Sequence, residues 1–104
     1  MTEVKAIFFL PVKDNDGRDL AEEIEDLISR ICERFSGWTF EGCVSGAFRM
    51  ADGSQKLDVC EKYMVLLDRS RIGELKGLLQ QFKEKTLQES IYLEVQHHVD
   101  IDLI

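Results

Sequence analysis

Residues 4–12, Val-Lys-Ala-Ile-Phe-Phe-Leu-Pro-Val, decide the fold. Ile7 to Leu10 are apolar at both alternating sets of strand positions, so both sides of this strand must be covered. Tyr63 to Leu67 form a second run of this kind. The other two β-like segments interleave apolar with polar residues, which is typical of strands at the edge of a sheet. The sequence therefore predicts a sheet with these two runs at its centre.

Helical and strand periodicities extend outward from this stretch and predict six elements. Apolar residues recur at helical spacing in two segments and at strand spacing in four. Asp19 with Glu22 resembles a capping box, Gly37 stands where a left-handed C-cap belongs, and either Asp68 or Ser70 could cap the second helix. In order, the elements are Val4 to Val12 (strand), Asp19 to Phe35 (helix), Trp38 to Met50 (strand), Leu57 to Leu67 (strand), Ser70 to Leu87 (helix) and Ile91 to Ile104 (strand).

Asp52-Gly53 is a strong signal for a two-residue hairpin turn. A loop of only those two residues sets the pairing of the flanking strands. Cys43 and Cys60 then become diagonal neighbours on one face, although a disulfide is not favoured in a reducing compartment. The predicted pairs are Phe48 with Leu57, Gly46 with Val59, Val44 with Glu61, Gly42 with Tyr63, and Phe40 with Val65.

The element order βαββαβ predicts the ferredoxin-like α+β sandwich. Two right-handed crossovers place the first and third strands at the centre of a four-stranded antiparallel sheet, with two helices on one face. Residues 1–104 contain no repeat, linker or low-complexity tract, so one domain is expected.

Composition narrows the classes of function. The net charge is −7, which argues against direct binding to nucleic acid or an anionic membrane, because both need a basic surface. There is no membrane-length apolar run and no leader peptide, and the three cysteines show no C-x-x-C spacing. We expect a cytoplasmic protein without cofactor or metal.

Two helices cover only one face of a four-stranded sheet, yet the central strands are apolar on both. An exposed apolar face usually marks an interaction site. The last strand is also too long for a domain of this size, so its end should bend or project. We expect a homodimer, the commonest closed assembly, with an interface formed by Ile7, Phe9, Met64, Leu66, Val99, Ile101 and Leu103.

Two titratable residues interrupt apolar faces. His97 interrupts the last strand, and Glu61 interrupts the face that also carries Tyr63. The structural interpretation is a hydrogen-bonded core histidine and a carboxylate close to water. The catalytic interpretation makes His97 a base, Glu61 a polar anchor and Tyr63 a donor in one pocket. His97 and His98 point to opposite faces, so they cannot jointly hold a metal.

An acidic cluster begins at the turn after the first strand and continues into the first helix. Negative side chains stabilise a helix N-terminus, so the cluster needs no partner. A second interpretation is a surface that engages a basic partner. The turn itself resembles a calcium loop, but Val12 occupies the position that needs the first carboxylate. The cluster comprises Asp14, Asp16, Asp19, Glu22, Glu23 and Asp26, with Glu25 beside them.

The chain weakly resembles a set of short, uncharacterised bacterial and phage proteins with this fold. The features that match are spread over most of the chain: Pro11 before Asn15-Asp16-Gly17, Gly37-Trp38-Thr39, Gly46, Asp52-Gly53, and Ile91 to Val95. That family has no established activity, so no catalytic residue is implied. In element order the chain is also similar to antibiotic-biosynthesis-type monooxygenases, which are dimeric, but fold does not imply function.

Three hypotheses follow. The first is a non-catalytic module that self-associates through the open face of its sheet. The second is a small acidic inhibitor or regulator of another protein, phage-encoded and mimicking nucleic acid. The third is a small-molecule-binding or monooxygenase-like dimeric enzyme that would use His97, Glu61 and Tyr63.

Overall fold

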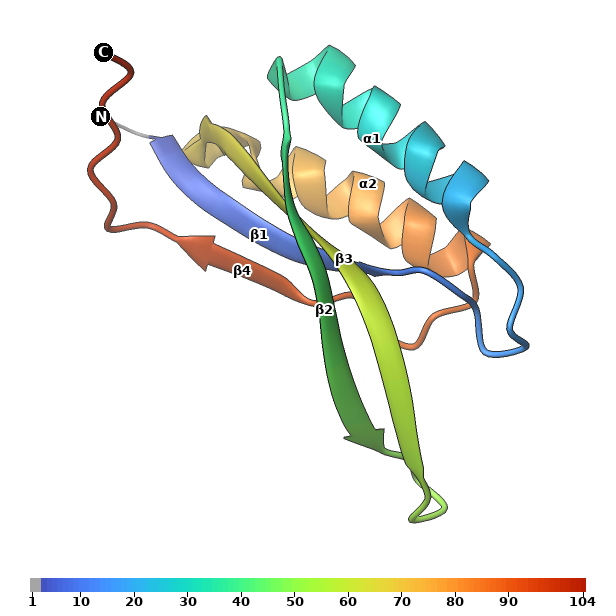
Figure 1. Ribbon diagram of the computed structural model, residues 1–104. Helices are drawn as coiled ribbons and strands as arrows, with labels where there is room; N and C mark the ends of the chain where they lie inside the picture. The colour runs from blue at the N-terminus through green and yellow to red at the C-terminus, as the bar shows by residue number, and fades with distance from the viewer. Residues whose placement is uncertain (1–2) are drawn as a thin grey trace.

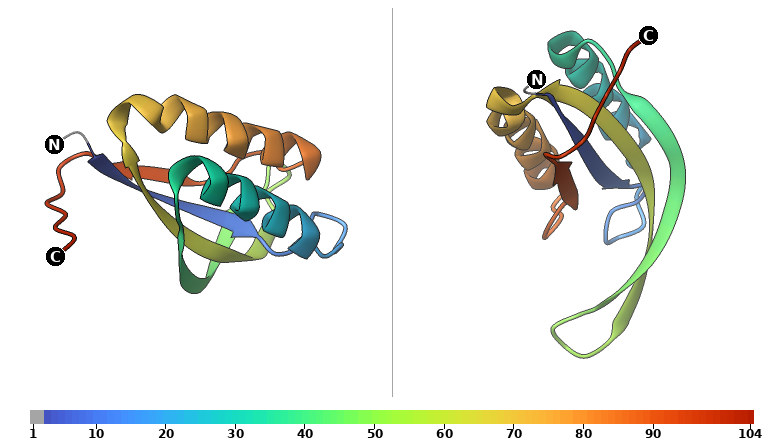
Figure 2. Two further views of the ribbon diagram at one scale, coloured as in Figure 1. Left: turned by 90° about the horizontal axis from the view of Figure 1, so that it is seen from above. Right: turned by 90° about the vertical axis from the view of Figure 1, so that its left-hand side faces the viewer.

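The computed structural model describes residues 3–104 and has the βαββαβ order that the sequence predicts. Its four antiparallel strands form one sheet in the order β2-β3-β1-β4, so β1 and β3 are central, and both helices lie on one face (Figures 1 and 2). The ferredoxin-like α+β fold is thus confirmed. The elements are β1 (Glu3–Pro11), α1 (Ala21–Phe35), β2 (Thr39–Arg49), β3 (Gln55–Asp68), a short 3-10 turn (Arg69–Arg71), α2 (Ile72–Lys85) and β4 (Leu93–Gln96).

Strand β1 divides its side chains between the two faces of the sheet. Its even-numbered residues point to the helices and are completely buried, whereas Ile7 and Phe9 point to the face without helices, which we call the open face. Met64 and Leu66 of β3 are paired with Ile7 and Lys5, so they share the open face.

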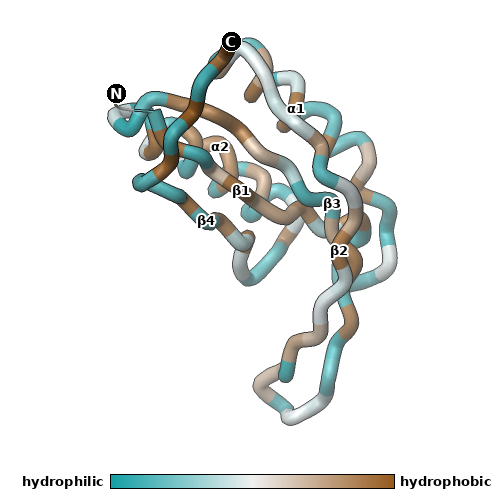
Figure 3. The backbone as a smooth tube through the Cα atoms, turned by 60° about the vertical axis from the view of Figure 1, so that its left-hand side comes forward, coloured by the Kyte–Doolittle hydropathy of each residue, from teal (hydrophilic) through white to brown (hydrophobic). Residues whose placement is uncertain are grey.

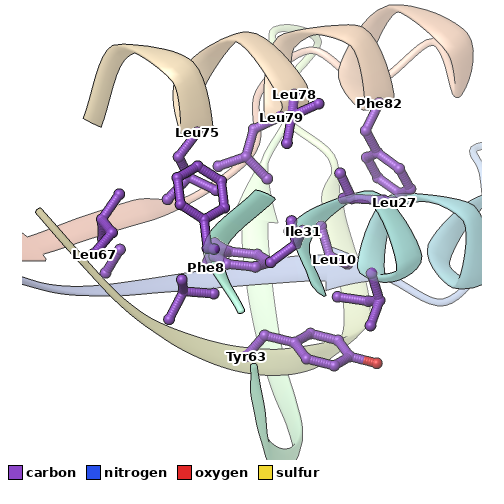
Figure 4. Close-up of a cluster of buried hydrophobic side chains, with 14 of the residues drawn as sticks. Phe8, Leu10, Leu27, Ile31, Tyr63, Leu67, Leu75, Leu78, Leu79 and Phe82 are labelled. Carbon is purple, nitrogen blue, oxygen red and sulfur yellow. The ribbon is translucent and has the colours of Figure 1, made fainter. Parts of the chain in front are cut away.

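One hydrophobic core lies between the sheet and the helices (Figure 4). Phe8 is completely buried there, and its ring stacks on Tyr63 with centroids 5.9 Å apart. Each large side chain buried this way stabilises the fold by roughly 1.5–3 kcal/mol. Further core residues are Val4, Ala6, Leu10, Ile24, Leu27, Ile28, Ile31, Phe35, Val65, Leu67, Leu75, Leu78, Leu79 and Phe82.

The helix ends differ in detail from the prediction. Asp19 Oδ1 accepts a 2.7 Å hydrogen bond from the Ala21 backbone N–H, so Asp19 does satisfy a donor at the start of α1. The left-handed residue is Ser36 (φ 67°) and not Gly37, because α1 ends at Phe35, as predicted, and Ser36 follows it directly with its N–H donating to the Cys32 carbonyl. Asp68, rather than Ser70, is the cap before α2, since its carboxylate accepts from the Ser70 N–H at 2.9 Å.

The predicted two-residue turn is wrong, because the loop spans residues 50–54. Met50 N–H donates to Ser54 O at 2.7 Å, and Gly53 N–H donates to Met50 O at 2.9 Å. The Asp52 carboxylate accepts the Ser54 N–H at 2.8 Å, which stabilises this wider loop. The pairing is therefore shifted by one residue: Phe48 lies opposite Lys56, and not Leu57.

A β-bulge at Gly42 shifts the pairing again. Gly42 has φ +97°, which favours glycine, and beyond it Phe40 lies opposite Tyr63 rather than Val65. The shifts also separate two cysteines that were expected to be neighbours. Cys43 lies opposite Glu61 on the helix side, whereas Cys60 lies opposite Val44 on the open face.

The last strand is much shorter than Ile91 to Ile104. Strand β4 pairs only with β1, with Gln96 opposite Lys5. In this register residue 98 would oppose Glu3, the first residue that the structure describes, and the pairing with β1 ends at Gln96. Residues 97–104 leave the sheet as a tail, and its Leu103 lines a cavity together with Glu3 at the start of β1 (Figures 1 and 2).

Strands β2 and β3 continue well beyond the helices as a projecting hairpin (Figures 1 and 2). The protein is consequently elongated, with extents of 46 × 26 × 23 Å. The hydropathy of the backbone tube shows apolar segments along this hairpin, outside the cover of the helices (Figure 3). Exposed apolar side chains lie on both sides of the hairpin, with Phe48 on one face and Leu57 on the other.

Candidate functional site

A charged belt crosses the middle of the open face. Lys62 Nζ lies 3.8 Å from Glu41 Oε1, which links β3 to β2. On the β4 side, Glu94 accepts hydrogen bonds from the Gln96 amide at 2.8 Å and the Tyr92 hydroxyl at 2.9 Å. These two hydrogen bonds, with the positive charges of Lys62 and Lys5, lower the pKa of Glu94. The belt separates two apolar regions at the ends of the face.

The four predicted interface residues on β1 and β3 are less exposed than the sequence indicates. Ile7 is only 6% exposed, although it lies on the open face, so it is already covered within one chain. Phe9 is half-buried, and its ring stacks on Tyr92 with centroids 4.5 Å apart. Met64 and Leu66 are also half-buried.

The tail lies at one end of the open face. Leu103 lines a cavity of about 390 Å³ together with Met64, Leu66 and Trp38. Val99 and Ile101 are partly buried, whereas Leu103 is 84% exposed. Leu103 therefore shares a cavity with two of the predicted interface residues of its own chain, and the role of all seven in self-association remains a prediction.

The other apolar end of the open face holds a cleft of about 290 Å³, which we call the open-face cleft. Its floor comes from β1 and β3, one wall from the hairpin, and the other wall from the segment before β4. Burial raises the pKa of the Cys60 thiol in this cleft, with a smaller effect from the charge of Asp58, so Cys60 is held in its neutral form. The lining residues are Phe9, Pro11, Val44, Ser45, Gly46, Phe48, Asp58, Cys60, Gln88, Ser90, Ile91 and Tyr92.

The three residues of the catalytic interpretation do not share a pocket. Glu61 and Tyr63 line one cavity of about 290 Å³ beside Trp38, on the helix side of the sheet. The Tyr63 hydroxyl donates a 2.8 Å hydrogen bond to Glu61 Oε1. Burial raises the pKa of Tyr63 far above its usual value, and the hydrogen bond to Glu61 adds to this, so it is a poor proton donor. His97 is exposed at the end of β4, outside that cavity.

The helix side of the hairpin carries a row of exposed apolar side chains, which we call the hairpin strip. It consists of Trp38 (44% exposed), Phe40 (47%), Val59 (46%) and Leu57 (79%). The residues were visible in the sequence, but the predicted register set Leu57 and Val59 opposite Phe48 and Gly46. The one-residue shift puts Phe48 on the open face and leaves Leu57 and Val59 on the other.

The acidic cluster is partly neutralised within the chain. Arg18 Nε lies 3.2 Å from Asp14 Oδ2, and Arg18 Nη1 lies 3.6 Å from Glu23 Oε2. Asp14 also accepts the backbone N–H groups of Arg18 and Asp16, and the hydrogen bond from the Arg18 backbone is the main reason that its pKa is lowered. Asp14 thus has a structural role in its turn, whereas Asp16, Asp19 and Glu22 are exposed.

A cluster of metal ligands or a membrane-spanning helix would indicate a particular class of function. Within residues 3–104, no three histidine, cysteine, aspartate or glutamate side chains gather in a way that could hold a metal ion. Across the same residues, no helix has the length and apolar character needed to span a membrane.

No family model matches this chain, and no curated protein matches it. Several solved structures do resemble it. A phage SAM lyase in complex with S-methyl-5'-thioadenosine has a TM-score of 0.71 and 18% identity, covering 92% of this chain and 81% of the lyase. CutA1 from Oryza sativa has a TM-score of 0.70 and 12% identity, covering 97% of this chain and 84% of its own.

A DUF3240 family protein from Shewanella baltica has a TM-score of 0.67 and 12% identity, covering 100% of this chain and 98% of its own. At these identities the likeness shows the fold and not the function. The chain is therefore similar in fold to small α+β proteins from phage, bacteria and a plant, which confirms its weak resemblance to short bacterial and phage proteins of the ferredoxin-like fold.

Proposed function

We propose that this protein is a non-catalytic interaction module that associates with a second copy of itself through the hairpin of β2 and β3. The observation that carries the proposal is the hairpin strip. Leu57 is 79% exposed on an element that projects beyond the core, and Val59 is 46% exposed beside it. Apolar side chains gathered on one face in this way are typical of a protein contact surface.

The charge of the hairpin supports contact between two copies. Residues 39–63 hold three basic side chains (Arg49, Lys56, Lys62) and four acidic ones (Glu41, Asp52, Asp58, Glu61), so this segment has a charge of −1. The whole chain has a charge of −7. Two acidic molecules repel each other least where their surfaces carry little net charge, and the hairpin is one such surface.

The outer edge of β2 offers a second contribution. Strand β2 is an edge strand of eleven residues, and within the described part of the chain no strand pairs with its outer side. Backbone N–H and C=O groups on such an edge can pair with another strand. Pairing of β2 with its copy brings the adjacent apolar side chains together as well.

Light scattering at micromolar concentration tests the proposal. The wild-type protein is expected to have twice the 12.0 kDa of one chain. Replacing both Leu57→Lys and Val59→Lys should give a monomer, because both side chains are exposed and the substitutions leave the core intact. Leu87→Lys is the matched control, since Leu87 is 81% exposed but lies outside the hairpin, and it should remain a dimer.

A clean wild-type monomer contradicts self-association altogether. The pair Met64→Lys and Leu66→Lys separates two surfaces, because these residues lie on the open face. A dimer that survives the hairpin substitutions and is lost with Met64→Lys and Leu66→Lys would use the open face instead.

A further inference from the structure

The open-face cleft is built by three segments that are far apart in the sequence. Phe9 and Cys60 form part of its floor, Phe48 stands on the hairpin, and Gln88 to Tyr92 close the opposite side. Its volume of about 290 Å³ is near the lower limit of small-molecule pockets, roughly 300–1,000 Å³. A cleft of this size suits a ligand with one or two small ring systems.

Gly46 opens a slot in the hairpin wall. It lies between Val44 and Phe48 on the same face of β2, and a Cβ atom built on Gly46 meets no atom within 4 Å. Glycine within a strand often marks a place where a ligand approaches the backbone. The slot is one side chain wide, so it fits the edge or face of a flat ring.

Two aromatic side chains border this space from different elements. Phe48 is 55% exposed on the hairpin, and Tyr92 is 50% exposed beside β4. The Tyr92 ring is held in place by stacking on Phe9 and by its hydroxyl, which donates to Glu94. Stacking of a planar base on an exposed aromatic ring contributes about 1–3 kcal/mol of binding free energy for each base.

Asp58 supplies the polar side of the cleft. It lies directly opposite Gly46, so its carboxylate reaches the same space. Lys56 Nζ is 3.9 Å from Asp58 Oδ1, too far for a hydrogen bond, and Lys56 donates to Asn15 instead. Within residues 3–104 no group donates a hydrogen bond to the Asp58 carboxylate, which leaves its oxygens available as acceptors for ligand hydroxyl groups.

The geometry points to a nucleoside without phosphate as the ligand of this cleft. The base would stack at the Gly46 slot, and the ribose hydroxyl groups would donate to Asp58. None of the described residues that line the cleft is basic, and the chain has a charge of −7, so a phosphate group is disfavoured. The cleft is on the opposite face of the hairpin from Leu57 and Val59, so it shares no side chain with the hairpin strip.

Calorimetric titration of the protein, residues 1–104, with adenosine tests the site, with AMP and tyramine as comparison ligands. Adenosine is expected to bind saturably, once per chain. Gly46→Val should weaken binding at least about tenfold, because its side chain fills the slot. The variant should fold, since that Cβ meets nothing and valine favours strands. Asp58→Asn should weaken binding about tenfold by removing a charged acceptor.

Ala47→Val is the matched control, because Ala47 is the next residue of β2 and points to the other face. It should leave adenosine affinity unchanged. AMP should bind at least about tenfold more weakly than adenosine, because its phosphate meets the acidic cleft. The proposal is overturned if adenosine shows no saturable binding, if Gly46→Val and Ala47→Val bind equally well, if AMP binds as tightly as adenosine, or if tyramine binds more tightly than adenosine.

Discussion

The Tyr63 hydroxyl donates a 2.8 Å hydrogen bond to Glu61 Oε1, two residues earlier on the same face of β3. The Tyr63 ring belongs to the core at 7% exposure (Figure 4). It makes an edge-to-face contact with the Trp38 ring, with centroids 5.8 Å apart. Glu61 is half-buried where β3 leaves the cover of the helices. The pair therefore explains why a carboxylate interrupts an apolar face: it satisfies the hydroxyl of a buried tyrosine.

The stability of the fold should decrease at alkaline pH because of Tyr63. Burial, and then the hydrogen bond and charge of Glu61, raise its pKa in the folded state. A raised pKa means that the stabilising effect is complete below the unfolded value of about 10 and is lost as the pH rises through the folded pKa. We expect the unfolding free energy, measured with urea, to fall above about pH 10.

Tyrosinate absorbance identifies the residue responsible. The chain has two tyrosines, so Tyr92→Phe leaves only Tyr63 to titrate. Adding Glu61→Gln should move the midpoint of Tyr63 downward, because the carboxylate no longer favours the neutral phenol. An ordinary midpoint near 10 in Tyr92→Phe alone would contradict the burial argument.

Replacing Phe8→Ala should be among the most damaging changes in the core. Phe8 is completely buried and stacks on Tyr63, so its loss leaves a cavity between sheet and helices. We expect a loss of about 3–5 kcal/mol in unfolding free energy. Phe48→Ala is the control, since Phe48 is 55% exposed, and equal losses for the two would be inconsistent with this core.

The central features of the fold could be predicted because they depend on patterns within single segments. Ile7 to Leu10 are apolar on both parities, and the structure places them in a central strand with Phe8 in the core and Ile7 on the open face. Each helix carries one apolar stripe, which the sequence shows directly. Ile7 does lie on the open face, but Glu94, opposite Ile7, and Lys62, opposite Phe9, also bring charge to the middle of that face.

Features that depend on how distant segments meet could not be predicted from the sequence. Asp52-Gly53 favours a tight turn, yet the Asp52 side chain closes a wider loop by accepting from Ser54. The alternation of Val99, Ile101 and Leu103 is typical of a strand, but among residues 3–104 the pairing of β4 with β1 stops at Gln96 and these residues lie outside the sheet. The open-face cleft brings Gly46 close to the residues around Tyr92. It could be predicted only with the correct pairing of β2 and β3, because that pairing decides which face Gly46 lies on.

Gly42→Ala should destabilise the protein by roughly 1–2 kcal/mol, because alanine disfavours the positive φ of +97° that the bulge requires. Gly46→Ala is the matched control on the same strand: its backbone needs no positive φ, and its Cβ would meet no atom within 4 Å. That control should change the unfolding free energy by less than about 0.5 kcal/mol. If Gly42→Ala and Gly46→Ala lowered the unfolding free energy in urea by the same amount, the bulge at Gly42 would be contradicted.

The contact between the two helices should weaken in acid. Glu74 accepts hydrogen bonds from Arg71 Nε at 3.0 Å and from Arg34 Nη1 at 3.3 Å, while the Arg71 guanidinium lies 4.4 Å above the Phe35 ring. The hydrogen bond from Arg71, followed by that from Arg34, lowers the pKa of Glu74. A lowered pKa gives stability that is present above the unfolded value of about 4.3 and is lost as the pH falls through the folded pKa.

Urea unfolding at neutral and at acid pH measures this effect. The unfolding free energy of the wild type should fall with pH, and Glu74→Gln should show a smaller fall, because its side chain has no charge to lose. Glu33→Gln is the control, since Glu33 is exposed on α1 and should keep the wild-type dependence. If Glu74→Gln and the wild type lose the same amount of stability between the two conditions, Arg71 and Arg34 do not hold the two helices through this carboxylate.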